Sequence, residues 1–164
     1  MGLVVPLERL TSIRNDARRQ GKSVVFTNGV FDIIHRGHVE YLAKAGSLGD
    51  ILIVGLNSDA SVRGIKGDLR PIVAEDDRAF VLANLSPVDY VCIFNESTPD
   101  RIIRALIPDV LVKGADWKID DIVGKDVVEG AGGRVATIDY IPERSTSGII
   151  DRILQRFGPR VGTK

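Results

Sequence analysis

Short apolar runs alternate with amphipathic segments along the whole chain, and this alternation restricts the possible folds more than any other feature. The runs lie at residues 23–28, 51–56, 89–94, 110–113 and 134–140. The run at 51–56 is continuously apolar, which is typical of a parallel strand covered on both faces. The segments between the runs repeat their apolar residues at helical spacing. Strands that alternate with helices predict an α/β fold with a parallel sheet.

The length of the chain fits one domain of this kind. A chain of 164 residues can bury an ordinary core but leaves little room for a second domain. We therefore predict a Rossmann-like, doubly wound, five-stranded parallel sheet with right-handed crossovers over residues 1–157. Residues 158–164 read as a flexible C-terminal tail.

Charge and hydropathy exclude several classes of partner. The 22 basic and 22 acidic side chains balance, so no overall field attracts nucleic acid or an anionic membrane surface. No apolar stretch is long enough to span a bilayer, and the N-terminus lacks the pattern of a signal peptide. We expect a cytoplasmic protein without nucleic-acid or membrane partners. The single cysteine, Cys92, lies in an apolar strand and reads as a buried, inert thiol.

Polar clusters follow the predicted strands, where parallel sheets usually bind their ligands. They span residues 27–38, 57–70, 113–117 and 144–147, and the first holds both histidines of the chain, His35 and His38. There is no Gly-x-Gly-x-x-Gly after the first strand and no P-loop, which argues against a dinucleotide dehydrogenase and a P-loop NTPase. Gly29, Gly37 and the free amides of the following helix could still bind an anion.

The histidine pair has two other interpretations. His35 and His38 could be ordinary polar residues near a helix cap. Asp32, His35 and His38 also recur every third residue, which suggests a zinc site, but three residues within one turn are poorly placed to surround a tetrahedral ion. The neighbouring Gly29 and Gly37 favour phosphate binding.

The motifs resemble those of the cytidylyltransferase-like nucleotidyltransferases. The resemblance rests first on Thr27-Asn28-Gly29-Val30-Phe31-Asp32, then on His35-Arg36-Gly37-His38 and on Ser145-Thr146-Ser147 before the last helix. Residues 56–62, 65–67, 70–71 and 112–116 are similar to the heptose 1-phosphate adenylyltransferase branch of that family. The likeness covers about residues 7–155.

This resemblance implies a reaction. Such an enzyme transfers AMP from ATP to D-glycero-β-D-manno-heptose 1-phosphate, giving ADP-heptose and pyrophosphate for lipopolysaccharide or other surface-glycan biosynthesis. A sugar phosphate, with a second pKa of about 6, is already an oxyanion at neutral pH and needs no protein base. Catalysis then consists of alignment and charge neutralisation. The resemblance also implies Mg²⁺ held by the ATP phosphates rather than by protein ligands.

The resemblance assigns roles to individual residues. It makes His35, His38 and Lys66 the catalytic residues that stabilise charge on the phosphates. The nucleotide-binding residues that it implies are Thr27, Asn28, Gly29, Phe31, Gly37, Lys113, Gly114, Asp116, Ser145 and Thr146. The acceptor-binding residues that it implies are Asp32, Arg78 and Trp117.

Two positions depart from the family patterns. Ala115 stands in a loop that is usually Gly-Gly-Asp or Gly-Asp-Asp, and Ile141-Pro142-Glu143-Arg144 replaces the Arg-Thr-Glu-Gly-Ile of cytidylyltransferases. The second departure suits an adenine pocket built from backbone around residues 138–141.

Several expectations stay open beside this reading. The alternatives are another alcohol-phosphate nucleotidyltransferase, such as a glycerol-3-phosphate cytidylyltransferase, and a nucleotide-binding module without turnover. The length leaves no room for a fused sugar kinase, so we expect a separate kinase and phosphatase to make the substrate. A homodimer or higher homo-oligomer is expected for so small an enzyme.

Overall fold

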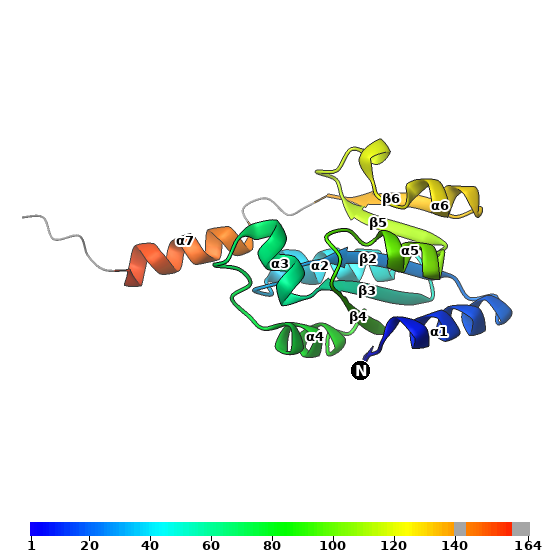
Figure 1. Ribbon diagram of the computed structural model, residues 1–164, viewed down its shortest axis with the longest axis horizontal. Helices are drawn as coiled ribbons and strands as arrows, with labels where there is room; N and C mark the ends of the chain where they lie inside the picture. Colours follow the sequence, from blue (N-terminus) through cyan, green and yellow to red (C-terminus); the bar gives the residue numbers. More distant parts are fainter. Residues whose placement is uncertain (140–143, 159–164) are drawn as a thin grey trace, which may run out of the picture.

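A parallel six-stranded sheet forms the centre of the computed structural model, which describes residues 1–139 and 144–158 (Figure 1). All neighbouring strands are parallel, and their order is β1-β4-β3-β2-β5-β6. The strands are β1 Leu3–Val4, β2 Val24–Gly29, β3 Ile51–Asn57, β4 Tyr90–Phe94, β5 Val110–Gly114 and β6 Arg134–Ile138. The predicted doubly wound α/β fold is confirmed.

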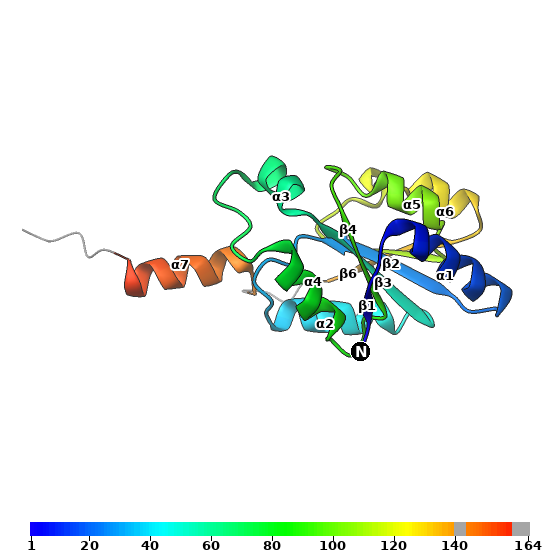
Figure 2. The same ribbon diagram turned by 60° about the horizontal axis from the view of Figure 1, so that its bottom comes forward.

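Helices cover both faces of the sheet (Figure 2). They are α1 Leu7–Arg19, α2 Arg36–Gly46, α3 Asp59–Lys66, α4 Glu75–Ala83, α5 Asp100–Leu106, α6 Lys125–Gly130 and α7 Thr146–Phe157, with a 3₁₀ turn at Ile119–Asp121. One core cluster packs α2 and α4 on the sheet through Leu42 and Leu82. The other packs α1, α5 and α6 on the opposite face through residues such as Leu10 and Ile103. Burial of β2, β3 and β5 on both faces explains their continuous apolar runs.

The predicted number of strands was wrong by one. Leu3–Val4 forms an additional edge strand that pairs with Tyr90 and Val91 of β4. Both of its residues are exposed, and two residues are too few to show a period in the sequence. The segment at residues 119–129, which lies between two predicted strands and would be one helix on that alternation, is broken into the 3₁₀ turn and α6, because Gly124 between them has a φ of +85°.

The strand order creates a switch point at β2. From β2 the chain runs to β3 on one side, and from β4 it crosses back to β5 on the other side of β2. Loops that leave the carboxyl ends of strands on the two sides of such a point diverge and open a cleft. All the polar clusters of the sequence follow strands at this edge.

The C-terminal end of the chain is described only in part. Helix α7 projects from the body of the domain, with the sheet and the other helices at its N-terminal side (Figure 1). Of the predicted tail, Gly158 is described and residues 159–164 lie outside the described residues, as do residues 140–143 of the predicted adenine pocket. Among the described helices, none combines the length and apolarity needed to cross a bilayer.

Candidate functional site

A cavity of about 710 Å³ opens at the carboxyl ends of the strands around β2. Residues of all four polar clusters line it. From the predicted set, the lining includes Asn28, Gly29, Phe31, Asp32, His35, Gly37, His38, Lys66, Lys113, Gly114, Asp116, Trp117, Ser145 and Thr146. The predicted residues Thr27 and Arg78 are not in the lining. A cavity of this volume is large enough for a nucleotide.

The two histidines line the cavity from the start of α2, where His35 is the N-cap and His38 lies in the first turn. Their rings are stacked, with centroids 3.8 Å apart and planes 20° apart, and Phe31 meets His38 edge-on at 5.2 Å. Burial, and then the charge of Arg144, lowers the pKa of His35. Burial, and then the charge of His35, lowers the pKa of His38 to about 4. Both rings are therefore neutral at pH 7.

Each imidazole has an unsatisfied polar atom. The Nδ1 atoms of His35 and His38 are buried and have no hydrogen-bond partner among the described residues. Leaving such an atom unpaired costs about 1–3 kcal/mol. Two buried nitrogens without a partner, on residues that line a cavity, need an explanation, and a polar ligand is one.

Gly37 lets the two rings adopt this arrangement. A Cβ atom at Gly37 would lie 3.0 Å from both Cε1 and Nδ1 of His35 and 3.2 Å from Cβ of Arg144. The sequence predicts that Gly37 admits a ligand close to the backbone. In the structure, the space beside its Cα is occupied by the His35 ring, so this glycine packs the histidine pair.

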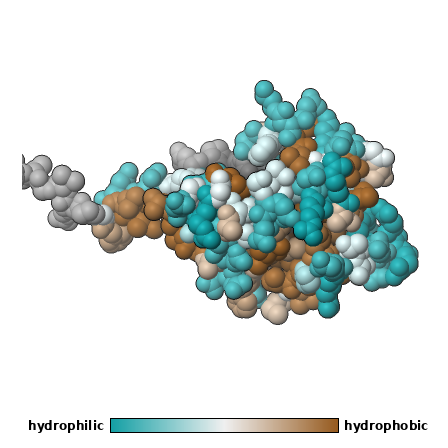
Figure 3. Space-filling view, in the orientation of Figure 1, coloured by the Kyte–Doolittle hydropathy of each residue, from teal (hydrophilic) through white to brown (hydrophobic). Residues whose placement is uncertain are grey.

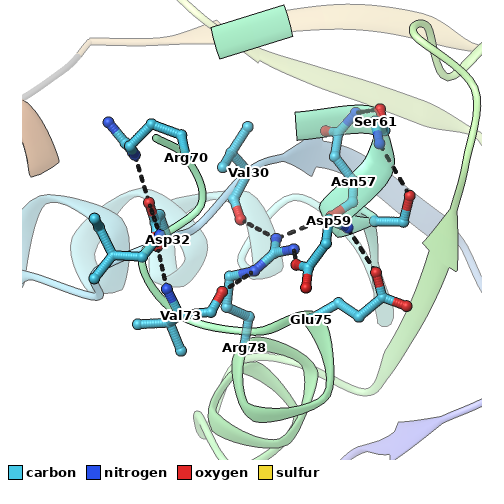
Figure 4. A network of polar contacts seen from close by, with 11 residues as sticks. Val30, Asp32, Asn57, Asp59, Ser61, Arg70, Val73, Glu75 and Arg78 are labelled. Atoms are coloured by element: carbon cyan, nitrogen blue, oxygen red, sulfur yellow. Dashed lines mark hydrogen bonds and ion pairs between the residues drawn. The ribbon is translucent and has the colours of Figure 1, made fainter. Parts of the chain in front are cut away.

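Asp32 anchors the segment at residues 66–74, which runs from the end of α3 to α4, on the β3 side of the cavity (Figure 4). We call this segment the basic loop, because it carries Lys66 and Arg70. Its buried carboxylate accepts hydrogen bonds from the backbone N–H of Ile72 at 2.8 Å and of Val73 at 2.9 Å, and from Nε of Arg70 at 2.6 Å. Burial alone would raise the pKa of Asp32, but these three donors hold that pKa below its usual value. Asp32 is thus ionised and ties the loop after α3 to the end of β2.

Asp32, His35 and His38 do not form the set of ligands that the zinc interpretation requires. The Asp32 carboxylate is bound by the loop, and the two imidazoles lie face to face instead of converging on one point. Within residues 1–139 and 144–158, no three His, Cys, Asp or Glu side chains group as metal ligands. Three splayed ligands, which catalytic zinc needs, are therefore not provided here.

Arg78 is not among the residues that line the cavity, and its guanidinium lies between Val30 and Asp59 (Figure 4). Its side chain is fully buried, and its guanidinium donates to the carbonyl oxygens of Val73, Val30 and Asn57 and to Oδ1 of Asp59 at 2.6–2.9 Å. These bonds join β2, β3, α3 and the loop before α4. The structure thus places Arg78 in the framework of the site and leaves its donors no free direction toward an acceptor.

The β5 side of the cavity has a different character. Lys113, at the end of β5, is buried, donates to Oδ1 of Asn28 and lies 5.7 Å from the ring centre of Trp117. Burial lowers the pKa of Lys113 to about 8, and the nearby Asp116 offsets part of that effect. Trp117 and Asp116 are exposed on the loop that follows. This side combines a lysine that loses its charge above about pH 8 with an aromatic surface.

The start of α7 closes the cavity from a third direction. Ser145 is the N-cap, and its hydroxyl accepts from the backbone N–H of Gly148 at 3.0 Å. Thr146 donates to the carbonyl oxygen of Ile33 at 3.5 Å, a long contact between α7 and the loop before the histidines. A helix N-terminus carries a partial positive charge and unpaired amides, which suits a phosphate.

Some lining residues were not predicted from the sequence. They are Val30, Tyr41, Asn57, Ile65, Arg70, Ser97, Thr98, Pro99, Val123, Arg144 and Ser147. The hydroxyl of Thr27 donates to the carbonyl oxygen of Val112 at 3.0 Å and accepts the hydroxyl proton of Tyr41 at 2.7 Å. Thr27 therefore holds a lining residue, Tyr41, without lining the cavity itself. A tyrosine on an apolar helix face gives no sequence signal. Arg70 belongs to the polar cluster at residues 57–70 and to the family-like segment 70–71, but no role in the site was predicted for it.

Comparisons with known proteins agree with this geometry. The cytidylyltransferase-like family matches residues 26–152. The bifunctional protein HldE of Syntrophotalea carbinolica is 55% identical over 150 residues, which are 92% of this chain and 31% of that protein. The protein of the same name from Geobacter metallireducens is 53% identical, over 93% of this chain and 31% of its own length. The chain thus spans about a third of these relatives.

Solved structures show the same fold. A lipopolysaccharide core biosynthesis protein from Thermoplasma volcanium superposes with a TM-score of 0.61 at 30% identity, covering 74% of this chain and 98% of that one. A pantoate-β-alanine ligase from Francisella tularensis has a TM-score of 0.65 at 16% identity, over 90% of this chain and 69% of that one, and shows the fold alone. Because the family match includes most of the sheet, the histidine pair and the start of α7, the chain belongs to the cytidylyltransferase-like family.

Proposed function

We propose that this chain transfers AMP from ATP to D-glycero-β-D-manno-heptose 1-phosphate and so forms ADP-heptose and pyrophosphate. The observation that carries the proposal is the pair of neutral, stacked imidazoles with unbonded Nδ1 atoms, placed between a basic loop and a helix N-terminus. The choice of sugar follows the motif resemblance and is supported by the relatives named bifunctional protein HldE. The neighbour titled a lipopolysaccharide core biosynthesis protein points the same way.

The chemistry needs no general base from the protein. A phosphate oxygen of the sugar forms a bond to the α-phosphorus of ATP, while the bond from that phosphorus to the bridging oxygen breaks and pyrophosphate leaves with the electron pair. The attacking oxygen is already charged, since the second pKa of a phosphate monoester is about 6. The protein then has to bring two anions into line and stabilise the charge that moves to the leaving group.

The residues of the cavity divide this task. His35 and His38 donate N–H groups to phosphate oxygens, which requires only the neutral rings that the structure contains. Lys66 adds a positive charge from the end of α3, and the amides at the start of α7, near Ser145 and Thr146, receive the leaving phosphates. Trp117 and Lys113 cover the nucleotide from the β5 side.

Magnesium fits this cavity mainly as a partner of the triphosphate. Asp32 and Asp116 are the carboxylates in the described lining, and Asp32 is already engaged by three donors. Asp116 accepts no hydrogen bond within the described residues and is the side chain left to assist the ion. When bound, Mg²⁺ neutralises triphosphate charge. Most of its ligands would be phosphate oxygens and water, as is usual for this ion.

Pyrophosphate release tests the proposal. The purified chain is assayed with ATP, CTP, GTP and UTP, each against heptose 1-phosphate and glycerol 3-phosphate, with Mg²⁺ present. We expect release with ATP and the heptose phosphate. Release with CTP and glycerol 3-phosphate would favour the cytidylyltransferase alternative, and nucleotide binding without release from any pair would favour a binding module.

Self-association stays a prediction. Ile153, Leu154 and Phe157 on α7 are 50%, 62% and 83% exposed, and Figure 3 shows this hydrophobic surface on the projecting helix. Exposed apolar side chains in such a group often mark a contact between chains. Analytical ultracentrifugation over a range of concentrations would show a mass above that of one chain if the prediction holds.

A further inference from the structure

We propose that Arg70 binds the phosphate of the acceptor and that Asp32 holds Arg70 in position to do so. This inference rests on the proposed function, because it names the residue that recognises the second anion of that reaction. It moves to Arg70 the acceptor role that the sequence assigned to Arg78.

Arg70 has donors that no protein group uses. Its Nε is bound to Asp32, while its terminal nitrogens have no partner among the described residues. The side chain is 18% exposed and lines the cavity, in contrast to the fully buried Asp32 side chain behind it. A guanidinium anchored through Nε presents its remaining N–H groups as a fork, a geometry that matches phosphate oxygens.

The anchor itself is rigid. Asp32 is held by the N–H groups of Ile72 and Val73 as well as by Arg70, so the carboxylate and the loop fix each other. The backbone N–H of Arg70 also donates to the carbonyl oxygen of Gly67 at 3.0 Å, which closes a turn just after Lys66. An arginine positioned in this way loses little conformational entropy when it binds an anion.

The position of Arg70 also suits an in-line reaction. Arg70 and Lys66 follow β3, whereas Ser145 and Thr146 follow β6, and these strands lie on opposite sides of β2. The attacking phosphate and the leaving pyrophosphate must lie on opposite sides of the α-phosphorus. Two phosphate-binding groups on opposite flanks of the histidine pair meet this requirement.

Steady-state kinetics test the role of Arg70. Arg70→Gln should raise the KM for the sugar phosphate about 10- to 100-fold, the scale of one charge-assisted contact, with the KM for ATP changed less than about threefold. Arg63→Gln is the matched control, because Arg63 is exposed on α3 outside the cavity lining and its side chain forms no hydrogen bond or ion pair within the described chain. Equal rises in both KM values, or no change, would overturn the inference.

A binding experiment separates this inference from the proposed function. Inorganic phosphate is titrated into the ¹⁵N-labelled chain saturated with a non-hydrolysable ATP analogue, and the amide signals of Ile72 and Val73 are followed. Phosphate should shift these signals, with a dissociation constant at least about tenfold weaker in Arg70→Gln than in the wild type or Arg63→Gln. The same difference in phosphate binding is expected even if the protein does not turn over heptose phosphate. Equal binding by all three proteins would sink the Arg70 site while leaving any measured turnover intact.

The positioning role of Asp32 is tested by coupling. Asp32→Asn alone should raise the KM for the sugar phosphate, but adding it to Arg70→Gln should have little further effect, because both changes remove the same contact. Thermal melting identifies any loss of folding. If the effects of the two substitutions on KM multiply in the double variant, Asp32 acts independently of Arg70 and the positioning role is wrong.

Discussion

The two flanks of the cavity are built in opposite ways. On the β3 side, the ion pairs Arg70–Asp32 and Arg78–Asp59 form without a ligand and leave the terminal nitrogens of Arg70 without a partner among the described residues. On the β5 side, Lys113 bonds to Asn28, while Trp117 and Asp116 are exposed on a loop. The first flank is preorganised by ion pairs, and the second is open and carries the aromatic surface.

The difference fits two kinds of ligand group. A small, fully charged phosphate gains most from donors fixed in advance, since none of its binding energy is lost in ordering them. A nucleoside is larger and flatter and can be covered by a loop that closes after it binds. The histidine pair stands between the flanks, where the reacting phosphorus would lie.

The largest expected effect concerns the framework of the β3 flank. Arg78→Met leaves Asp59 and three carbonyl groups without their donor and should lower the free energy of unfolding by about 3–5 kcal/mol. Arg36→Met, at an exposed ion pair with Glu40, is the matched control and should cost less than about 1 kcal/mol. Urea denaturation measures both. Equal costs would mean that the β3 flank is no more rigidly built than the surface.

The next largest effect is expected at the histidine pair between the two flanks. His38→Ala should lower kcat at least about a hundredfold, the scale of losing one donor to a developing charge, with a smaller change in affinity for ATP. Stopped-flow pyrophosphate release and nucleotide titration measure the two quantities. Equal losses of kcat and affinity would show that the imidazole contributes only to binding, and the division into two binding flanks and a reacting centre would not hold.

Much of the architecture could be predicted from the sequence, because the apolar runs of β2, β3 and β5 are buried on both faces of the sheet and keep their own pattern. The location of the cavity also followed from the order of strands and helices. Leu3–Val4 could not be recognised, since two exposed residues acquire their strand conformation only by pairing with β4. The broken helix after residue 119 depends on a single left-handed glycine, Gly124.

The partners of the charged side chains in the site could not be predicted from the sequence. Lys66, Arg70 and Arg78 look alike in a sequence, and only the packing shows that Arg78 is buried among carbonyl groups while Arg70 reaches the cavity. The reason for Gly37 was also hidden, because it depends on where the ring of His35 lies. Residue type thus indicated phosphate chemistry, and the fold decided which cation is available for it.

A smaller effect is expected from the spacing within the histidine motif. Gly37→Ala places a Cβ 3.0 Å from the His35 ring and should reduce kcat/KM about tenfold by displacing that ring. Stability should not fall much, since alanine favours helix by about 1 kcal/mol over glycine. Gly64→Ala in α3 is the control, because a Cβ atom there would meet no neighbouring atom within 4 Å. If both variants keep full activity, the stacking of the rings is not needed for catalysis.

The smallest effect tests the open flank through pH. Burial lowers the pKa of Lys113 to about 8, so this lysine is charged below that pH and increasingly neutral above it. Affinity for ATP should therefore fall about three- to tenfold between pH 7.5 and 9, where phosphate groups with a second pKa of about 6 are already ionised. Lys113→Met should bind ATP more weakly at pH 7.5 and should lose most of this dependence. Isothermal titration calorimetry at each pH measures the dissociation constant for ATP. If the ATP affinity of the variant changes with pH as much as that of the wild type, another group causes the dependence, and the charge of Lys113 does not contribute to ATP binding.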